Sequence, residues 1–208
     1  YIDIPKTGSI PDAMAKKVIH GYYASVSYVD AQIGVLIKGL TELGLRENTV
    51  IVLVGDHGWS LSEHGLWAKH SNFEVALQVP LIISDSRLPN AARTNSIAEL
   101  VDIYPTLCEL TAGESPTHLQ GSSLVSALEA PGTIFKDVAL ARWQKGETLI
   151  VDQLFYTEWQ RKDKVVSKML YNHETDPNET NNLANDPAYL STVKALSKQL
   201  EQFKTTFN

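Results

Sequence analysis

The chain has 208 residues, of which 43% are hydrophobic and 20% are charged. These proportions are typical of globular proteins and exclude a disordered or collagen-like chain. Its 24 acidic and 18 basic side chains give a formal net charge of -6, and no cluster of Lys and Arg forms the basic face that nucleic-acid binding needs. The longest apolar runs, 50–54 and 79–83, are far shorter than the roughly 20 residues that span a bilayer. We therefore expect neither nucleic acid nor a membrane as a partner.

A long amphipathic helix is predicted over residues 12–43, and Gly44 follows it as a C-terminal glycine. Apolar residues recur within it at steps of three and four, which predicts one buried stripe along the helix. The residues of this stripe are Val18, Tyr22, Val26, Val29, Ile33, Leu36, Ile37 and Leu40.

The next segment, 49–54, is rich in β-branched residues and apolar on both faces. Such a run is typical of a strand in the middle of a parallel sheet that helices cover. Only a short link separates it from the preceding helix, and this alternation is typical of an α/β fold. A second apolar strand is predicted at 79–83 and a second helix at 95–110.

The composition changes near residue 132. Short strands of an antiparallel sheet are predicted at 148–151, 154–159 and 165–171, and a terminal amphipathic helix is predicted over 188–203. We therefore expect two domains, an α/β domain over residues 1–131 and a small α+β subdomain over residues 132–208. The aromatic side chains of 155–159 could face a carbohydrate, although their spacing in a strand favours packing in the core.

The side chains best suited to catalysis or metal binding lie at 55–70, directly after the first strand. In open α/β sheets ligands bind beyond the carboxyl ends of the strands, which is where Asp56 and His57 lie. A carboxylate beside an imidazole suits one half of a metal site. The alternative is structural: Asp56 caps the turn and His57 is a hydrogen-bonded loop histidine.

Lys69 follows in the same loop. If the loop folds back over the end of the strand, its ammonium group can hold an anion as a compact point charge. The alternative is an ordinary solvated surface lysine. Glu63 and His64 are interpreted as residues that fix the loop by hydrogen bonds.

The sequence GDHGWSLSEHGLWAK at 55–69, followed by Asn72-Phe-Glu and Val79-Pro-Leu-Ile-Ile, resembles the sulfatase family of the alkaline-phosphatase superfamily. Within the family it is most similar to the iduronate-2-sulfatase branch. Segments 21–34, 100–107 and 170–183 resemble sulfatase segments in the same order. One departure is Ser62, which stands where the family usually has a glycine.

The resemblance implies an alkaline-phosphatase-like sheet flanked by helices, followed by a small α+β subdomain with a short antiparallel sheet and a terminal helix. It implies hydrolysis of a sulfate monoester of a sugar, with Asp56 and His57 as metal ligands and with Lys69 and His57 as catalytic residues. The family's metal is Ca2+. Mn2+ or Zn2+ is the alternative, because a site with histidine suits borderline metals. Since Ca2+ prefers oxygen ligands, His57 could instead contact the ester oxygen.

The family's Cys- or Ser-x-Pro-x-Arg motif, whose first residue becomes the nucleophile formylglycine, is not found in these 208 residues. Neither is the family's N-terminal pair of aspartates. We therefore expect a C-terminal portion that is inactive alone and partnered by the N-terminal half of the same enzyme. Tyr1–Lys6 shows no signal-peptide pattern, whereas the resemblance implies a periplasmic, secreted or lysosomal protein.

Two alternatives to a sulfatase stay open. One is a phosphodiester or phosphonate monoester hydrolase of the same superfamily. The other is a non-catalytic fragment or subunit that completes the site of another chain.

Overall fold

The computed structural model describes residues 10–88, 92–162 and 164–206. They form two compact units, the first made of 10–70 with 74–88 and the second of 71–73 with 92–206. Spatial compactness is a different criterion from the change of composition near residue 132. The division into domains 1–131 and 132–208 therefore stays a prediction.

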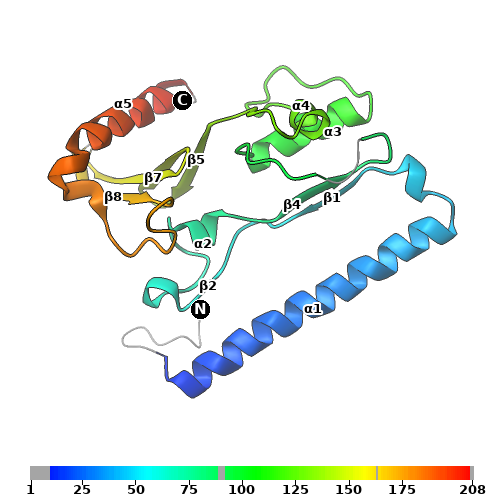
Figure 1. The fold of residues 1–208 in the computed structure, drawn as a ribbon, viewed down its shortest axis with the longest axis horizontal. Coiled ribbons are helices and arrows are strands. Elements are labelled where there is room, and N and C mark those ends of the chain that lie inside the picture. The colour runs from blue at the N-terminus through cyan, green and yellow to red at the C-terminus, as the bar shows by residue number, and fades with distance from the viewer. Residues whose placement is uncertain (1–9, 89–91, 163, 207–208) are drawn as a thin grey trace. The chain divides into compact units, whose positions relative to one another are not determined.

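The first unit begins with a 31-residue helix, α1 (Asp12–Glu42), as predicted (Figure 1). The expectation that its apolar stripe is buried is wrong for the described residues, since none of the helix's residues is buried. Val26, Val29 and Leu36 are each more than half exposed. The physical reason is that no described element covers most of the apolar stripe.

A short 3-10 helix, η1 (Arg46–Asn48), leads to β1 (Ile51–Val54), which pairs with β4 (Leu81–Ser84) in a two-stranded sheet. Both strands were predicted, but their pairing is antiparallel. The expected parallel neighbour requires a crossover connection. The segment that joins β1 to β4 contains no long crossover helix, and the chain returns in the opposite direction. The short elements of this segment are β2 (Ser60–Leu61), η2 (Glu63–Gly65), β3 (Trp67–Ala68) and α2 (Glu74–Leu77).

The second unit contains η3 (Leu100–Asp102), α3 (Ile103–Leu110) and α4 (Val125–Glu129). The helix predicted from residue 95 starts later, because Glu99 and Asp102 form a capping box at the start of η3. The fully buried carboxylate of Asp102 also accepts hydrogen bonds from Lys136 Nζ at 2.8 and 3.0 Å. This ion pair holds η3 against the segment that leads into the next sheet.

That sheet has four antiparallel strands in the order β5-β6-β7-β8. The strands are β5 (Val138–Trp143), β6 (Gly146–Val151), β7 (Leu154–Arg161) and β8 (Lys164–Asn172). Three of them confirm predicted strands, whereas β5 was not predicted. Two-residue turns join consecutive strands, and such tight turns fix the register of each pair.

After η4 (Leu183–Asn185) and η5 (Pro187–Tyr189), the predicted terminal helix is present as α5 (Leu190–Thr206). It packs on the sheet (Figure 1) and completes an apolar core whose most buried members include Leu149, Tyr156, Leu170 and Leu200. Tyr156 is therefore a core residue, which agrees with the packing interpretation of the aromatic strand. In the described part of the chain, no helix has both the length and the apolar character needed to cross a membrane.

Candidate functional site

The Asp56–His57 pair lies at the carboxyl end of β1, where the chain leaves the two-stranded sheet. The turn that carries the pair is packed tightly against α2. Gly58 N donates to Ala76 O at 3.0 Å, and a Cβ atom at Gly58 would lie 2.1 Å from Val75 O. Only glycine permits this approach, so Gly58 fixes the path of the backbone that presents His57.

The hairpin formed by β2 and β3 brings Lys69 to this turn. Ser60 pairs with Ala68 and Leu61 pairs with Trp67, so the chain returns beside the segment from which it left. Lys69 follows β3 directly and its Nζ atom lies 2.8 Å from Nε2 of His57. The loop therefore folds back as the sequence analysis anticipated, and it does so through main-chain pairing.

His57 is held from both sides of its ring. Nδ1 lies 2.8 Å from Gly58 O, and because a carbonyl oxygen only accepts, Nδ1 carries the proton. In the neutral ring Nε2 is then an acceptor for the Lys69 ammonium group. The same Nε2 atom lies 3.4 Å from Oδ2 of Asp56. The structure thus brings the three predicted site residues together around one imidazole nitrogen.

The three side chains differ in their access to solvent. The side chain of Asp56 is 87% exposed and that of His57 is 28% exposed, while Lys69 is half-buried. An exposed carboxylate suits a ligand that arrives from solution. A cation held at a fixed position in a partly desolvated site attracts an anion more strongly than a freely moving surface lysine.

An aromatic stack that was not predicted from the sequence supports the imidazole. The ring of Trp59 stacks on His57 with centroids 6.0 Å apart, and Tyr22 of α1 stacks on Trp59 at 6.3 Å. Tyr22 belongs to the apolar stripe of α1 and Trp59 to the motif after β1. No local sequence pattern relates two residues so far apart in the chain, so only their proximity reveals the stack.

Glu63 acts within the loop itself. Glu63 Oε2 accepts a hydrogen bond from Leu61 N at 2.5 Å, which confirms the interpretation that Glu63 fixes the loop. Ser62 has φ 108 and His64 has φ 55. Ser62 thus occupies a backbone region that favours glycine, which explains why a glycine suits this position.

Asn72, three residues after Lys69, has a structural role in the second unit. It is buried, and its Nδ2 atom donates to Gly146 O at 3.2 Å and to Thr148 Oγ1 at 3.0 Å. These bonds attach the segment 71–73 to β6. Within the ranges that the structure describes, no three His, Cys, Asp or Glu side chains gather as a candidate metal centre.

Comparison with known families decides the assignment. The family model "Sulfatase" matches residues 5–114, and the model "N-sulphoglucosamine sulphohydrolase, C-terminal" matches residues 62–206. The chain belongs to the sulfatase family. The second match also confirms the expectation of a C-terminal portion of a sulfatase.

Individual sulfatases share much of the sequence. A sulfatase of Formosa agariphila is 31% identical over 194 residues, which are 93% of this chain and 38% of that protein. Human iduronate 2-sulfatase is 38% identical over 134 residues, which are 52% of this chain and 24% of that protein. The expected similarity to the iduronate-2-sulfatase branch is confirmed. The chain spans less than half the length of these relatives.

Solved structures confirm the alkaline-phosphatase-like α/β fold class. A protein in complex with its substrate D-glucosamine-2-N,6-O-disulfate matches with a TM-score of 0.81 and 27% identity, over 88% of this chain and 40% of that one. A phosphonate monoester hydrolase of Silicibacter pomeroyi matches with a TM-score of 0.87 over 99% of this chain and 43% of that one. Its identity is 22%, so this second likeness concerns the fold alone.

Proposed function

We propose that this chain supplies the cation-bearing side of a sulfatase active site and that the enzyme hydrolyses a sulfate ester of a sugar. One observation carries the proposal: Lys69 Nζ and Asp56 Oδ2 lie 2.8 and 3.4 Å from the same atom, His57 Nε2. A fixed ammonium group beside a carboxylate able to hold a cation suits the negatively charged oxygens of a sulfate monoester.

Lys69 is proposed to contact a sulfate oxygen. Its ammonium group carries three donors, one of which is directed at His57, so two remain for a substrate. His57 orients the ammonium group through its acceptor nitrogen, and Gly58 fixes the tautomer that makes Nε2 an acceptor. When the sulfate binds, the positive charge of Lys69 is already in place, so little reorganisation is needed as negative charge develops.

Asp56 is proposed as a ligand of a divalent cation, with Ca2+ first and Mn2+ or Zn2+ as alternatives. Its exposed carboxylate fits a hard cation. His57 fits less well, because its acceptor nitrogen is engaged by Lys69. It can serve as a ligand only when Lys69 turns towards the sulfate. Ca2+ takes six to eight ligands, so most ligands in this proposal come from elsewhere in the enzyme. A bound cation would neutralise charge on the sulfate oxygens.

The remaining catalytic groups are proposed to come from the N-terminal half of the enzyme. Formylglycine, the family's nucleophile, is expected there, so we propose that the present chain is inactive alone. The relatives span more than twice the length that they share with this chain, and α1 exposes an apolar stripe that such a half could cover.

Sulfated sugars are proposed as the substrate class because of the named relatives. Besides human iduronate 2-sulfatase, they include an N-acetylglucosamine-6-O-sulfatase of Bacteroides thetaiotaomicron, 28% identical over 208 residues, which are 90% of this chain and 36% of that protein. The matching structure with a disulfated glucosamine points to the same class.

A substrate panel tests the proposal against its main alternative, a phosphonate monoester or phosphodiester hydrolase. The likeness in fold to the Silicibacter pomeroyi enzyme is the observation that favours the alternative. An enzyme that contains this chain and the N-terminal half should hydrolyse aryl sulfate and sulfated sugar far faster than the matched phosphonate monoester and phosphodiester. Faster turnover of either phosphorus ester would overturn the sulfatase proposal.

A further inference from the structure

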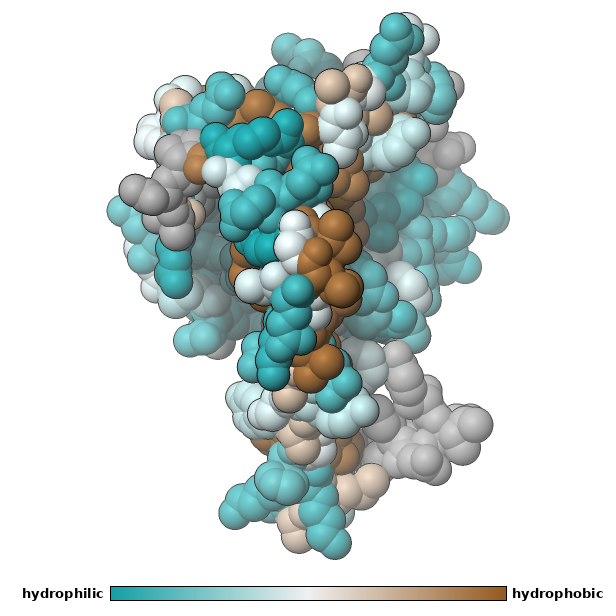
Figure 2. All heavy atoms as spheres, turned by 90° about the vertical axis from the view of Figure 1, so that its right-hand side faces the viewer, coloured by the Kyte–Doolittle hydropathy of each residue, from teal (hydrophilic) through white to brown (hydrophobic). Residues whose placement is uncertain are grey.

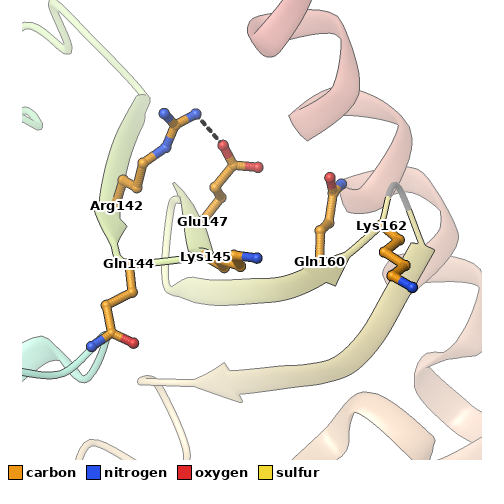
Figure 3. A pocket seen from close by; sticks show the side chains of 6 residues that line it. All are labelled: Arg142, Gln144, Lys145, Glu147, Gln160 and Lys162. Atoms are coloured by element: carbon orange, nitrogen blue, oxygen red, sulfur yellow. Dashed lines mark hydrogen bonds and ion pairs between the residues drawn. The ribbon is translucent and has the colours of Figure 1, made fainter.

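A small polar hollow lies at one end of the four-stranded sheet (Figure 3). Its residues belong to the second unit, whereas Asp56, His57 and Lys69 belong to the first. The volume of the hollow is about 260 Å3, below the range of ordinary ligand pockets, so it is a shallow depression that can contact one side of a ligand. Its lining consists of Arg142, Gln144, Lys145, Glu147, Gln160 and Lys162.

Two tight turns carry the lysines of this hollow. Gln144 and Lys145 form the two-residue turn between β5 and β6, closed by the pair Trp143 and Gly146. Lys162 belongs to the turn between β7 and β8, which leaves the same end of the sheet. Gln144 and Lys162 have φ 51 and φ 48, as expected for such hairpin turns. The two lysines therefore extend from turns at the same end of the sheet.

The charges of the lining do not cancel. Its one carboxylate, Glu147, already forms ion pairs with Arg142 and with Lys204. Burial of Glu147 opposes its ionisation, but hydrogen bonds from these two cations outweigh burial and hold its pKa below the ordinary value. Lys145 and Lys162 are both exposed, and among the described residues neither has an ion-pair partner. The hollow therefore has two positive charges that no carboxylate of the described residues pairs with, in a chain whose net charge is -6.

We propose that this hollow binds a sulfated unit of a glycan chain. Lys145 and Lys162 would pair with sulfate oxygens, and the amides of Gln144 and Gln160 could donate to and accept from sugar hydroxyl groups. The choice of a sulfated sugar rests on the proposed function. A single-stranded nucleic acid fits less well, because such sites stack bases on aromatic rings and none of the six lining residues is aromatic.

Binding of a sulfated heparin disaccharide to the complete enzyme, measured by calorimetry, tests the proposal. Lys145→Gln/Lys162→Gln should weaken binding about five- to tenfold, the size expected for two exposed charge contacts, and should reduce its salt dependence. The matched control is Lys194→Gln/Lys198→Gln, which removes the same charge from α5 and should change affinity less than twofold. Turnover of a small aryl sulfate should be unchanged in both variants.

Three results would overturn the proposal. They are unchanged affinity in Lys145→Gln/Lys162→Gln, an equal loss in the α5 control, and equal competition by inorganic sulfate or by a single-stranded oligonucleotide of the same charge. Failure of the proposed function gives a different result. In that case the enzyme would not hydrolyse aryl sulfate. The disaccharide would still bind, and Lys145→Gln/Lys162→Gln would still weaken the binding of the disaccharide.

Discussion

His57 Nε2 is the point at which the charged groups of the candidate site meet. Lys69 reaches it by a hydrogen bond of 2.8 Å, and Asp56 lies 3.4 Å from it. Because Gly58 O accepts from Nδ1, the ring presents an acceptor towards Lys69. Lys69 and Asp56 therefore have separate expected effects.

Lys69→Gln should lower kcat/KM for a sulfate ester by roughly a hundredfold or more, equivalent to about 3 kcal/mol, because one preorganised electrostatic contact is lost. Lys69→Arg should recover some of the activity, since the guanidinium group keeps the charge but not the compact shape. Steady-state kinetics of the complete enzyme measure both. Activity of Lys69→Gln within twofold of the parent would make Lys69 an ordinary surface lysine.

If Asp56 is a Ca2+ ligand, Ca2+ should raise the melting temperature of the parent enzyme, because a ligand that binds only the folded state stabilises it. Asp56→Ala should then abolish activity and remove this increase. Thermal unfolding with and without Ca2+ measures this effect separately from turnover. Asp85→Ala, which removes another carboxylate of the same unit, is the control and should keep the Ca2+ response. An unchanged Ca2+ response in Asp56→Ala would exclude Asp56 from the metal site.

Ser62→Gly should stabilise the protein by about 1 kcal/mol. The serine has φ 108, a backbone conformation that costs free energy for any residue with a Cβ atom and little for glycine. Urea unfolding measures the change, and Ser62→Ala is the matched control because alanine retains the strain. Equal stability of the two variants would show that the backbone relaxes at this position.

At the scale of elements, β6 connects three segments of the second unit. Its residue Glu147 pairs with Arg142 of β5 and with Lys204 of α5, and Asn72 bonds to its residues Gly146 and Thr148. The end of β6 thus ties the helix, the neighbouring strand and the segment 71–73 to one sheet.

Glu147→Gln should destabilise the protein by about 1 kcal/mol at pH 7, a value reduced for solvent screening. The pKa of Glu147 is lower in the folded than in the unfolded protein, so its contribution is complete above the unfolded pKa of about 4.3 and is lost as the pH falls through the folded pKa. Urea unfolding at pH 7 and at pH 3 should therefore show a difference from the parent that shrinks in acid.

Glu129→Gln is the control for this pH dependence, because Glu129 is exposed at the end of α4. It should change stability little at either pH. A Glu147→Gln variant whose difference from the parent is the same at both pH values would contradict the assignment of the ion pairs.

At the scale of the molecule, the exposed apolar surface is the feature that most needs a partner. The helix α1 buries none of its residues, and apolar side chains on the surface are seen in brown in Figure 2. Tyr28, Val35 and Leu36 of α1 are each at least 63% exposed. Large exposed apolar surfaces of this kind mark sites of association.

We expect the isolated chain to self-associate, and Val29→Glu/Leu36→Glu to reduce this association. Light scattering after size-exclusion chromatography measures the oligomeric state. The control Lys16→Glu/Lys38→Glu introduces acidic side chains on the same helix without removing apolar surface, and it should leave association closer to that of the parent. A monodisperse parent monomer with a sharp cooperative unfolding transition would show that the exposed surface is tolerated.

The sequence by itself determined what depends on neighbouring residues. The recurrence of apolar residues at steps of three and four predicted α1 with nearly its observed bounds. The β-branched apolar run at 49–54 predicted β1. Both patterns depend only on residues that are near one another in the chain. The motif at 55–69 placed Asp56, His57 and Lys69 in one loop directly after a strand.

Only the tertiary structure decided what depends on residues far apart in the chain. The antiparallel pairing of β1 with β4, the stack of Tyr22 on Trp59 and the exposure of the α1 stripe each depend on which elements lie side by side. The hollow of Lys145 and Lys162 likewise forms because two separate turns leave the same end of a sheet. Periodicity shows that a face is apolar, but only the neighbours in space determine whether it is buried.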